Sequence, residues 1–166
     1  MPKQTTFEAT TNGRTLILTR RFTATPEQVW AAWTEPRQMV HWWGPEGFTA
    51  RVPQQDLRPG GQWRCIMIGP DGTEYPAKGV FREIIPGKRI VTTDEFDEGL
   101  EAVVEVPLPD AIKMTVDFAP QEAGTLLTLT LDHASEADRR KHEDMGVIDG
   151  WASSLDCLEA HLKTLE

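Results

Sequence analysis

A few ionisable side chains in β-patterned segments are the candidates for chemistry in this sequence. Glu83, Asp94 and Glu95 are the acid–base candidates, with Arg64 and Tyr75 as candidate partners. A carboxyl group that faces an apolar pocket has a raised pKa and can act as an acid or a base. Strand alternation does not decide on which face of the sheet Glu83 and Asp94 lie, because one bulged residue would reverse the assignment. We therefore expect these carboxylates on the solvent side and assign no catalytic residue.

The histidines and the short motifs point away from metal and cofactor chemistry. His41, His133, His142 and His161 are scattered, and no HxH, HExxH or Cys/His spacing is present, so we expect no metal site. The sequence also has no G-x-S-x-G elbow, no P-loop and no G-x-G-x-x-G that opens a helix. These absences argue against serine hydrolases, kinases and dehydrogenases, and we expect no cofactor.

Aromatic and sulfur-containing side chains give the stronger signal. Trp63, Cys65 and Met67 share one face of a predicted strand, and such side chains suit a planar apolar ligand. The alternative is that they fill a closed core, as we expect for Trp30 and Trp33 on a helix face. The candidate ligand-binding residues are Trp43, Trp63, Cys65, Met67, Tyr75, Phe81, Phe96, Met114, Phe118, Trp151 and Leu155.

Length and charge restrict the partners. The chain has 166 residues, which suits one domain. Its net charge is −9 and it has no block of Lys and Arg, so nucleic acid and anionic membranes are not expected partners.

No apolar run approaches the roughly 18 residues that a membrane helix needs. The N-terminus has no signal-peptide pattern, and Cys65 and Cys157 are far apart. We expect free thiols, a cytoplasmic location, and a monomer or a homodimer that pairs through a sheet edge.

The first third of the chain predicts a strand and two helices. Residues 1–13 are polar and are interpreted as a tail that ends in an Asn-Gly turn. Alternation over 15–22 predicts a strand. Thr25 is a good N-cap and is followed by Pro26, which favours a helix that ends near Glu35. A second short helix is expected from residue 36 to about residue 42.

The middle of the chain is β-patterned and the end is helical. Residues 97–109 are expected to form a loop or a mobile edge strand. Ser135 and Asp138 resemble a capping box, and apolar residues recur at steps of three and four from Ile148 to Leu165. Together they predict one long amphipathic helix over 135–164 that contains Gly146 and Gly150. Glycine there would allow close backbone approach, a kink, or space for a ligand. The expected strands are 48–54, 62–68, 73–85 (broken near Pro76 and bulged at Gly79), 89–96, 111–118 and 125–131.

This order predicts an α+β fold. A curved antiparallel sheet of about six to seven strands would wrap around the long C-terminal helix, with two short helices after the first strand. We expect a single domain over residues 14–165. Such a sheet, held off by one helix, leaves room for an apolar cavity.

Several segments together resemble one family. They are TPEQVWAAW at 25–33, WWGPEGF at 42–48, DLRPGGQW at 56–63, GPDGTEY at 69–75, GVFREI at 79–84 and Gly150-Trp151. They are similar to the family named after the activator of Hsp90 ATPase (AHSA1-like), within the START-like (SRPBCC, Bet v 1-like) superfamily. The resemblance covers residues 14–165 and implies the helix-grip fold. The superfamily includes lipid carriers, hormone receptors, polyketide cyclases and dioxygenase subunits, which share a pocket.

Three functions remain open at this point. The first is binding of a small hydrophobic or aromatic molecule between sheet and helix. The second is a pocket enzyme, such as a cyclase or hydrolase, which requires an ionisable side chain that points inward. The third is a stress-related protein that assists an Hsp90-type chaperone. The eukaryotic activators resemble this domain with a separate chaperone-contacting N-terminal domain added, for which 166 residues leave no room.

Overall fold

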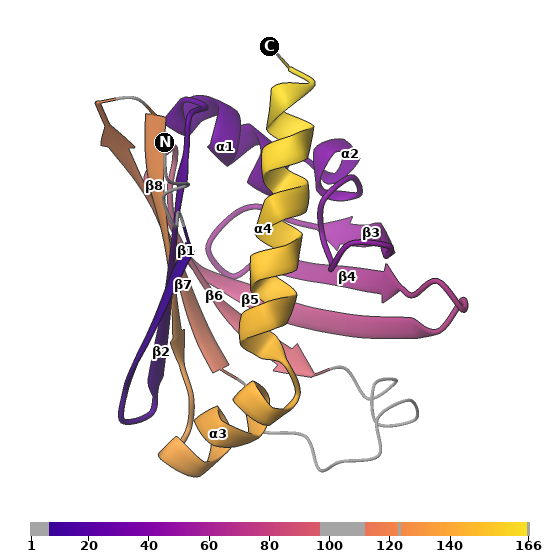
Figure 1. Cartoon of the computed structure of the whole chain (residues 1–166), viewed down its shortest axis with the longest axis vertical. Helices are drawn as coiled ribbons and strands as arrows, with labels where there is room; N and C mark the ends of the chain where they lie inside the picture. Colours follow the sequence, from indigo (N-terminus) through magenta and orange to yellow (C-terminus); the bar gives the residue numbers. More distant parts are fainter. Residues whose placement is uncertain (1–6, 97–111, 123, 166) are drawn as a thin grey trace, which may run out of the picture.

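The computed structural model describes residues 7–96, 112–122 and 124–165. Within these residues, eight strands form one antiparallel sheet in the order β1-β2-β8-β7-β6-β5-β4-β3. The sheet curves around the C-terminal helix α4, as Figure 1 shows, which is the helix-grip arrangement of the predicted α+β fold. The strands are β1 (Phe7–Asn12), β2 (Thr15–Phe22), β3 (Thr49–Gln55), β4 (Gln62–Ile68), β5 (Glu74–Ile85), β6 (Arg89–Phe96), β7 (Ile112–Gln121) and β8 (Gly124–Asp132).

The helices cover the concave side and one end of the sheet. Helices α1 (Pro26–Thr34) and α2 (Pro36–Met39) lie near the C-terminal end of α4 (Val147–Lys163), and α3 (Glu136–Asp144) lies near its start (Figure 1). The predicted N-cap Thr25 is present at the start of α1, and it forms a capping box with Gln28. Helix α4 is tied to the sheet by Arg20 of β2, whose guanidinium contacts Asp156 at 2.7 Å and Glu159 at 3.1 Å.

The N-terminal residues differ from the prediction. Residues 7–12 form β1, not a tail, and they pair with β2 from Phe7↔Arg20 to Asn12↔Thr15. Gly13, with φ of +60°, makes the tight turn between the two strands. The strand is polar because it is an exposed edge with only one neighbour, so its sequence shows no apolar alternation. This additional strand raises the count above the six to seven expected.

The predicted long helix is two helices. Gly146 separates α3 from α4 with φ of +90°, a left-handed conformation that favours glycine. Gly150, by contrast, lies within α4. The second short helix is also shorter than expected, because α2 ends at Met39. The expected loop or edge strand at 97–109 lies outside the described residues.

Strand β5 runs without a break. The pairing of β5 with the described residues of β6 begins at Ala77, so Pro76 lies just outside it, and a residue without an N–H is tolerated at such a position. The register shift lies between Phe81 and Glu83, not at Gly79. Glycine is required at position 79 for another reason: a Cβ there would lie 2.0 Å from the carbonyl oxygen of Thr93 and 2.5 Å from Nε1 of Trp63.

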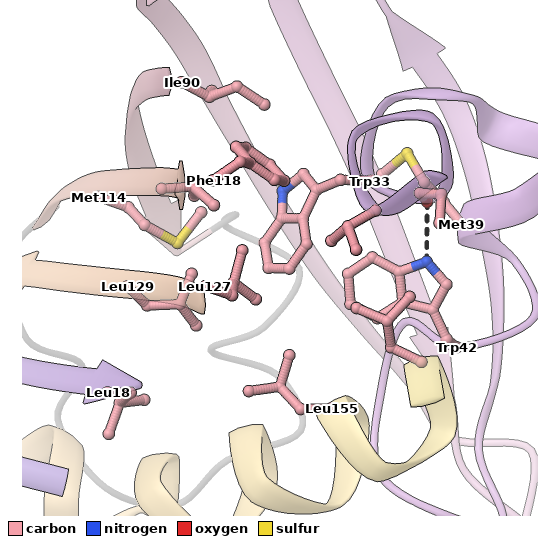
Figure 2. Packing of buried hydrophobic residues seen from close by; sticks show 14 of the residues in the cluster. Leu18, Trp33, Met39, Trp42, Ile90, Met114, Phe118, Leu127, Leu129 and Leu155 are labelled. Atoms are coloured by element: carbon pink, nitrogen blue, oxygen red, sulfur yellow. Dashed lines mark hydrogen bonds between the residues drawn. The ribbon is translucent and has the colours of Figure 1, made fainter. Parts of the chain in front are cut away.

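The core centres on Trp33 of α1. Its ring lies 4.7 Å from that of Trp42 and 6.0 Å from that of Phe118 between ring centroids. Figure 2 shows Trp33 between Phe118 and Trp42, with Leu155 of α4 below. The indole N–H of Trp42 donates to the carbonyl oxygen of Ala32 at 2.8 Å, which satisfies the one polar group that this buried ring carries.

The close approach at Gly79 gives a stability prediction. We expect Gly79→Ala to lower the free energy of unfolding by about 1–3 kcal/mol, because the added methyl group overlaps a backbone oxygen and a buried ring. The matched control is Gly150→Ala. A Cβ at Gly150 meets nothing within 4 Å, so the helix gains stability by about 0.5–1 kcal/mol. Urea unfolding measures both, and a loss of equal size in the two variants would contradict this account.

Candidate functional site

A cavity of about 400 Å³ lies between the sheet and the first half of α4. Residues of β4, β5 and β6 form its floor, α4 and the end of α3 form one wall, and residues 43–48 form its rim. The volume is within the range of roughly 300–1,000 Å³ that small-molecule sites occupy. The sequence left open whether this region is filled or hollow, and the structure shows a hollow.

Five aromatic rings line the cavity: those of Trp43, Phe48, Trp63, Tyr75 and Trp151. The ring of Trp43 lies 6.4 Å from that of Trp63 and 5.7 Å from that of Trp151, and it is steeply inclined to both. The rings of Phe48 and Tyr75, which also line the cavity, are 5.8 Å apart between centroids. Rings that brace one another edge to face keep their positions without closing the space between them.

Two serines of α4 position the rim. The backbone N–H of Gly44 donates to Oγ of Ser154 at 3.1 Å, and this hydroxyl donates to the carbonyl oxygen of Trp42 at 2.9 Å. The N–H of Glu46 donates to Oγ of Ser153 at 2.8 Å. These bonds direct Trp42 into the core, where it is 1% exposed, and leave Trp43 to line the cavity.

The indole N–H of Trp63 is bonded within the sheet. Its Nε1–H donates to Oγ1 of Thr92 at 2.7 Å, and this hydroxyl lies 3.1 Å from the carbonyl oxygen of Val80. The absence of a side chain at Gly79 provides the room that the indole occupies. The polar edge of the indole is therefore satisfied within the sheet, and its carbon surface borders the cavity.

Two glycines at and near the junction of α3 and α4 leave open space along one wall of the cavity. Met145, Gly146 and Gly150 line this side. A Cβ built on Gly150 would meet no atom within 4 Å. Of the three interpretations of this glycine offered by the sequence, the structure favours space rather than close approach or a kink.

Asp94 faces the cavity, contrary to the expectation that it lies on the solvent side. Its inward position follows from alternation along β6, where Ile90 and Thr92 are both 2% exposed. Burial raises the pKa of the Asp94 carboxyl to about 7, and the neighbouring Glu95 adds to this rise. Glu83 behaves as expected and is exposed. The register shift of β5 lies between Phe81 and Glu83, away from the residues that pair near Asp94. It therefore does not change the face of the sheet on which Asp94 lies.

His142, which was not predicted as a site residue, also lines the cavity, and it is bonded to His133. Nδ1 of His133 lies 3.1 Å from the carbonyl oxygen of Arg14, which can only accept, so this nitrogen carries the proton. In neutral His133, Nε2 then accepts from Nδ1–H of His142 at 3.0 Å. Burial and the neighbouring His133 lower the pKa of His142 to about 4. His142 lies on a highly polar helix, so no sequence pattern distinguished it.

Five of the eleven predicted site residues line the cavity: Trp43, Trp63, Met67, Tyr75 and Trp151. Their role in binding a ligand stays a prediction. Phe96 ends β6, and the position of its side chain is not described. Residues that line the cavity but were not predicted include Phe48, Met145 and Ser154.

The remaining predicted residues lie in the core. Cys65, Phe118 and Leu155 are at most 2% exposed and do not border the cavity. Phe81 and Met114 border a separate void of about 20 Å³ near Trp33, which is close to the minimum for one water. The pattern identified the inward face correctly, but it could not tell a packed position from one beside open space.

Two further observations concern metals and membranes. In the described parts of the chain, no three or more His, Cys, Asp or Glu side chains gather in a way that could hold a metal ion. None of the helices described here has the length and apolar character that crossing a membrane requires.

Comparison with known proteins gives a consistent result. The sequence profile of the family described as "Activator of Hsp90 ATPase homolog 1-like protein" matches residues 23–163. No curated protein matches the sequence.

Among solved structures, the chain is similar to a protein from Arthrobacter aurescens, with 26% identity and a TM-score of 0.86 over 96% of this chain and 93% of that one. It is similar to protein Ms6760 from Mycobacterium smegmatis, with 30% identity and a TM-score of 0.80 over 94% of each chain. It is also similar to protein NE0264 from Nitrosomonas europaea, with 29% identity and a TM-score of 0.76 over 92% and 96%.

The position of Asp94 predicts how stability changes with pH. In the unfolded chain the carboxyl ionises near its ordinary pKa of about 3.9, and in the folded chain near 7. The unfolded state therefore loses its proton first, and this group destabilises the fold increasingly as the pH rises from about 4 to about 7. We expect Asp94→Asn to stabilise the protein more at about pH 8 than at about pH 4.5.

Urea unfolding at both pH values measures this difference. The control is Glu83→Gln, which removes an exposed carboxylate from the neighbouring strand and should change stability equally little at both. The titration of His142 contributes equally to the free energy of unfolding of the wild type and the two variants, so it cancels in the comparison. An Asp94→Asn effect that is the same at the two pH values would show that the carboxyl is not buried as described.

Proposed function

Because the chain belongs to the family of activator of Hsp90 ATPase homolog 1-like proteins, we propose that it binds a small hydrophobic or aromatic molecule in the cavity between its sheet and α4. The fold and family are those of ligand-binding and co-chaperone-type domains. The observation that carries the proposal is a cavity of about 400 Å³ bordered by five aromatic side chains.

The unfilled apolar surface around the cavity supports a binding function over a purely structural role. Apolar surface that borders empty space loses both contacts and burial, so a cavity of this size is a cost to stability. Trp43 and Trp151 are each only half-buried, although the core next to them is well filled. A flat apolar ligand in the cavity, packed against these rings and Trp63, would restore the missing contacts.

A pocket enzyme is the second candidate, and one observation favours it. Asp94 supplies the inward-facing ionisable side chain that this alternative requires. A pKa of about 7 gives comparable populations of acid and base near neutral pH. His142 in the same cavity has a pKa shifted in the opposite direction. Turnover of any bound molecule that stops in Asp94→Asn would establish this alternative.

A co-chaperone function has less structural support. It predicts an apolar docking patch on the surface. In the described residues, the large hydrophobic side chains that are exposed are Ile85 and Leu165, which is too few for such a patch. The direct test is whether the purified protein stimulates Hsp90 ATPase activity at saturating concentration.

Location and assembly follow from less direct arguments. Both described cysteines are free thiols, Cys65 buried and Cys157 partly buried, which supports the proposed cytoplasmic location. The outermost strands of the described sheet are β1 and β3. Either edge would serve a homodimer that pairs strand to strand, and otherwise the chain is a monomer.

A variant that blocks the cavity without harming the fold tests the proposal. Gly150→Leu places a side chain into the open wall, where no atom lies within 4 Å of the new Cβ. Leucine is the better helix former by roughly 0.5–0.8 kcal/mol. We expect this variant to be at least as stable as the wild type and to lose binding of a neutral aromatic probe, 2-naphthalenemethanol, measured by calorimetry and native mass spectrometry.

The matched control is Ala160→Leu, which adds the same side chain at an exposed position of the same helix. This control should bind the probe as the wild type does. Equal binding by both leucine variants would place the probe elsewhere on the protein. If the wild type binds neither this probe nor other neutral aromatic molecules of similar size, the proposed function is wrong.

A further inference from the structure

We propose that the ligand is a hydrophobic amine, with an aromatic or alkyl body packed against the rings that line the cavity and one protonated nitrogen against the carboxyl group of Asp94. This inference rests on the proposed function and specifies the chemical class that the same cavity selects. It is carried by what the cavity surface contains and by what it lacks.

The described part of the cavity surface offers negative charge and no positive charge. Asp94 is the acidic residue among the described residues that line it, and none of these residues is Lys or Arg. His142 contributes no positive charge near neutral pH, because it is buried against His133. A carboxylate, sulfate or phosphate group would therefore meet a like charge without a partner, at the full cost of desolvation.

The rings add to this selectivity. The face of an aromatic ring carries negative electrostatic potential, and Trp is the strongest binder of cations among the side chains. Trp43, Trp63 and Trp151 border the cavity together with Tyr75. The indole N–H of Trp63 is held by Thr92, so the positive edge of this ring points into the sheet. Rings around a carboxylate are the surroundings in which an ammonium group is stabilised.

An amine would also relieve the unfavourable position of Asp94. A buried carboxylate without a counter-ion is costly, and an ammonium ion beside it favours the ionised form. Among residues 7–96, 112–122 and 124–165, the titratable groups around Asp94 are Glu95 on β6, Cys65 on β4, Tyr75 on β5 and His142 on α3.

Two of these groups keep one protonation state across the range of the test below. Burial raises the pKa of Cys65 to about 12, and that of His142 lies at about 4. Neither group therefore changes charge between about pH 5.5 and about pH 8.

Three probes with the same ring test the inference: 2-naphthylmethylamine, 2-naphthalenemethanol and 2-naphthoate. Calorimetry at about pH 8 should show the amine bound at least about tenfold more tightly than the alcohol, and the carboxylate bound most weakly. At about pH 5.5, where Asp94 is protonated, the preference for the amine should fall to within about threefold. This comparison uses the wild-type protein alone.

Variants then assign the preference to Asp94. Asp94→Asn should reduce the ratio of amine to alcohol affinity to near one at both pH values. Glu83→Gln removes an exposed carboxylate of β5 instead and should keep the wild-type ratio. An amine that binds no better than the alcohol at about pH 8, or a preference that persists in Asp94→Asn, overturns the inference and leaves the proposed function standing. If none of the three probes binds, both fail.

Discussion

The hydroxyl group of Ser154 makes the interaction on which the candidate site depends. It accepts from the N–H of Gly44 and donates to the carbonyl oxygen of Trp42, so one buried side chain joins α4 to the loop that follows α2. These two bonds decide that Trp42 enters the core and that its neighbour Trp43 borders the cavity. Arg20 fixes α4 to β2 through Asp156 and Glu159, which ties the second half of the helix to the sheet.

The carboxyl group of Asp94 is the feature that a purely structural protein would not need. Its burial opposes ionisation, and an apolar residue of the same size would remove that cost. The cavity around it is likewise costly, because aromatic surface there lacks contacts. Both costs are understandable if a ligand supplies the missing contacts and a counter-charge when it binds. The same position equally suits an acid or base, so Asp94 connects the binding function with the enzymatic alternative.

Regular patterns in the sequence predicted most of the fold and part of the site. Strands β2, β4 and β6 begin and end where alternation indicated, because each has a buried face. Strand β1 was missed because it is an exposed polar edge. The break at Gly146 was missed because the apolar repeat begins only at Ile148, so no pattern in the polar residues before it marks where α3 ends. Alternation from Ile90 and Thr92 could have placed Asp94 inward. No local pattern could separate Cys65, which is packed, from Met67, which borders the cavity, because this depends on the distance to α4.

The methionine methyl groups provide the most direct test of an open, ligand-binding cavity. Met67 and Met145 border the cavity, whereas Met39 and Met114 are buried in the core at 3% and 2% exposure. In a titration of the ¹³C-methyl-labelled protein with 2-naphthalenemethanol, we expect the NMR signals of Met67 and Met145 to shift and those of the two core methionines to stay nearly still. Signals that do not move at all, or that move equally at the four positions, would contradict the account.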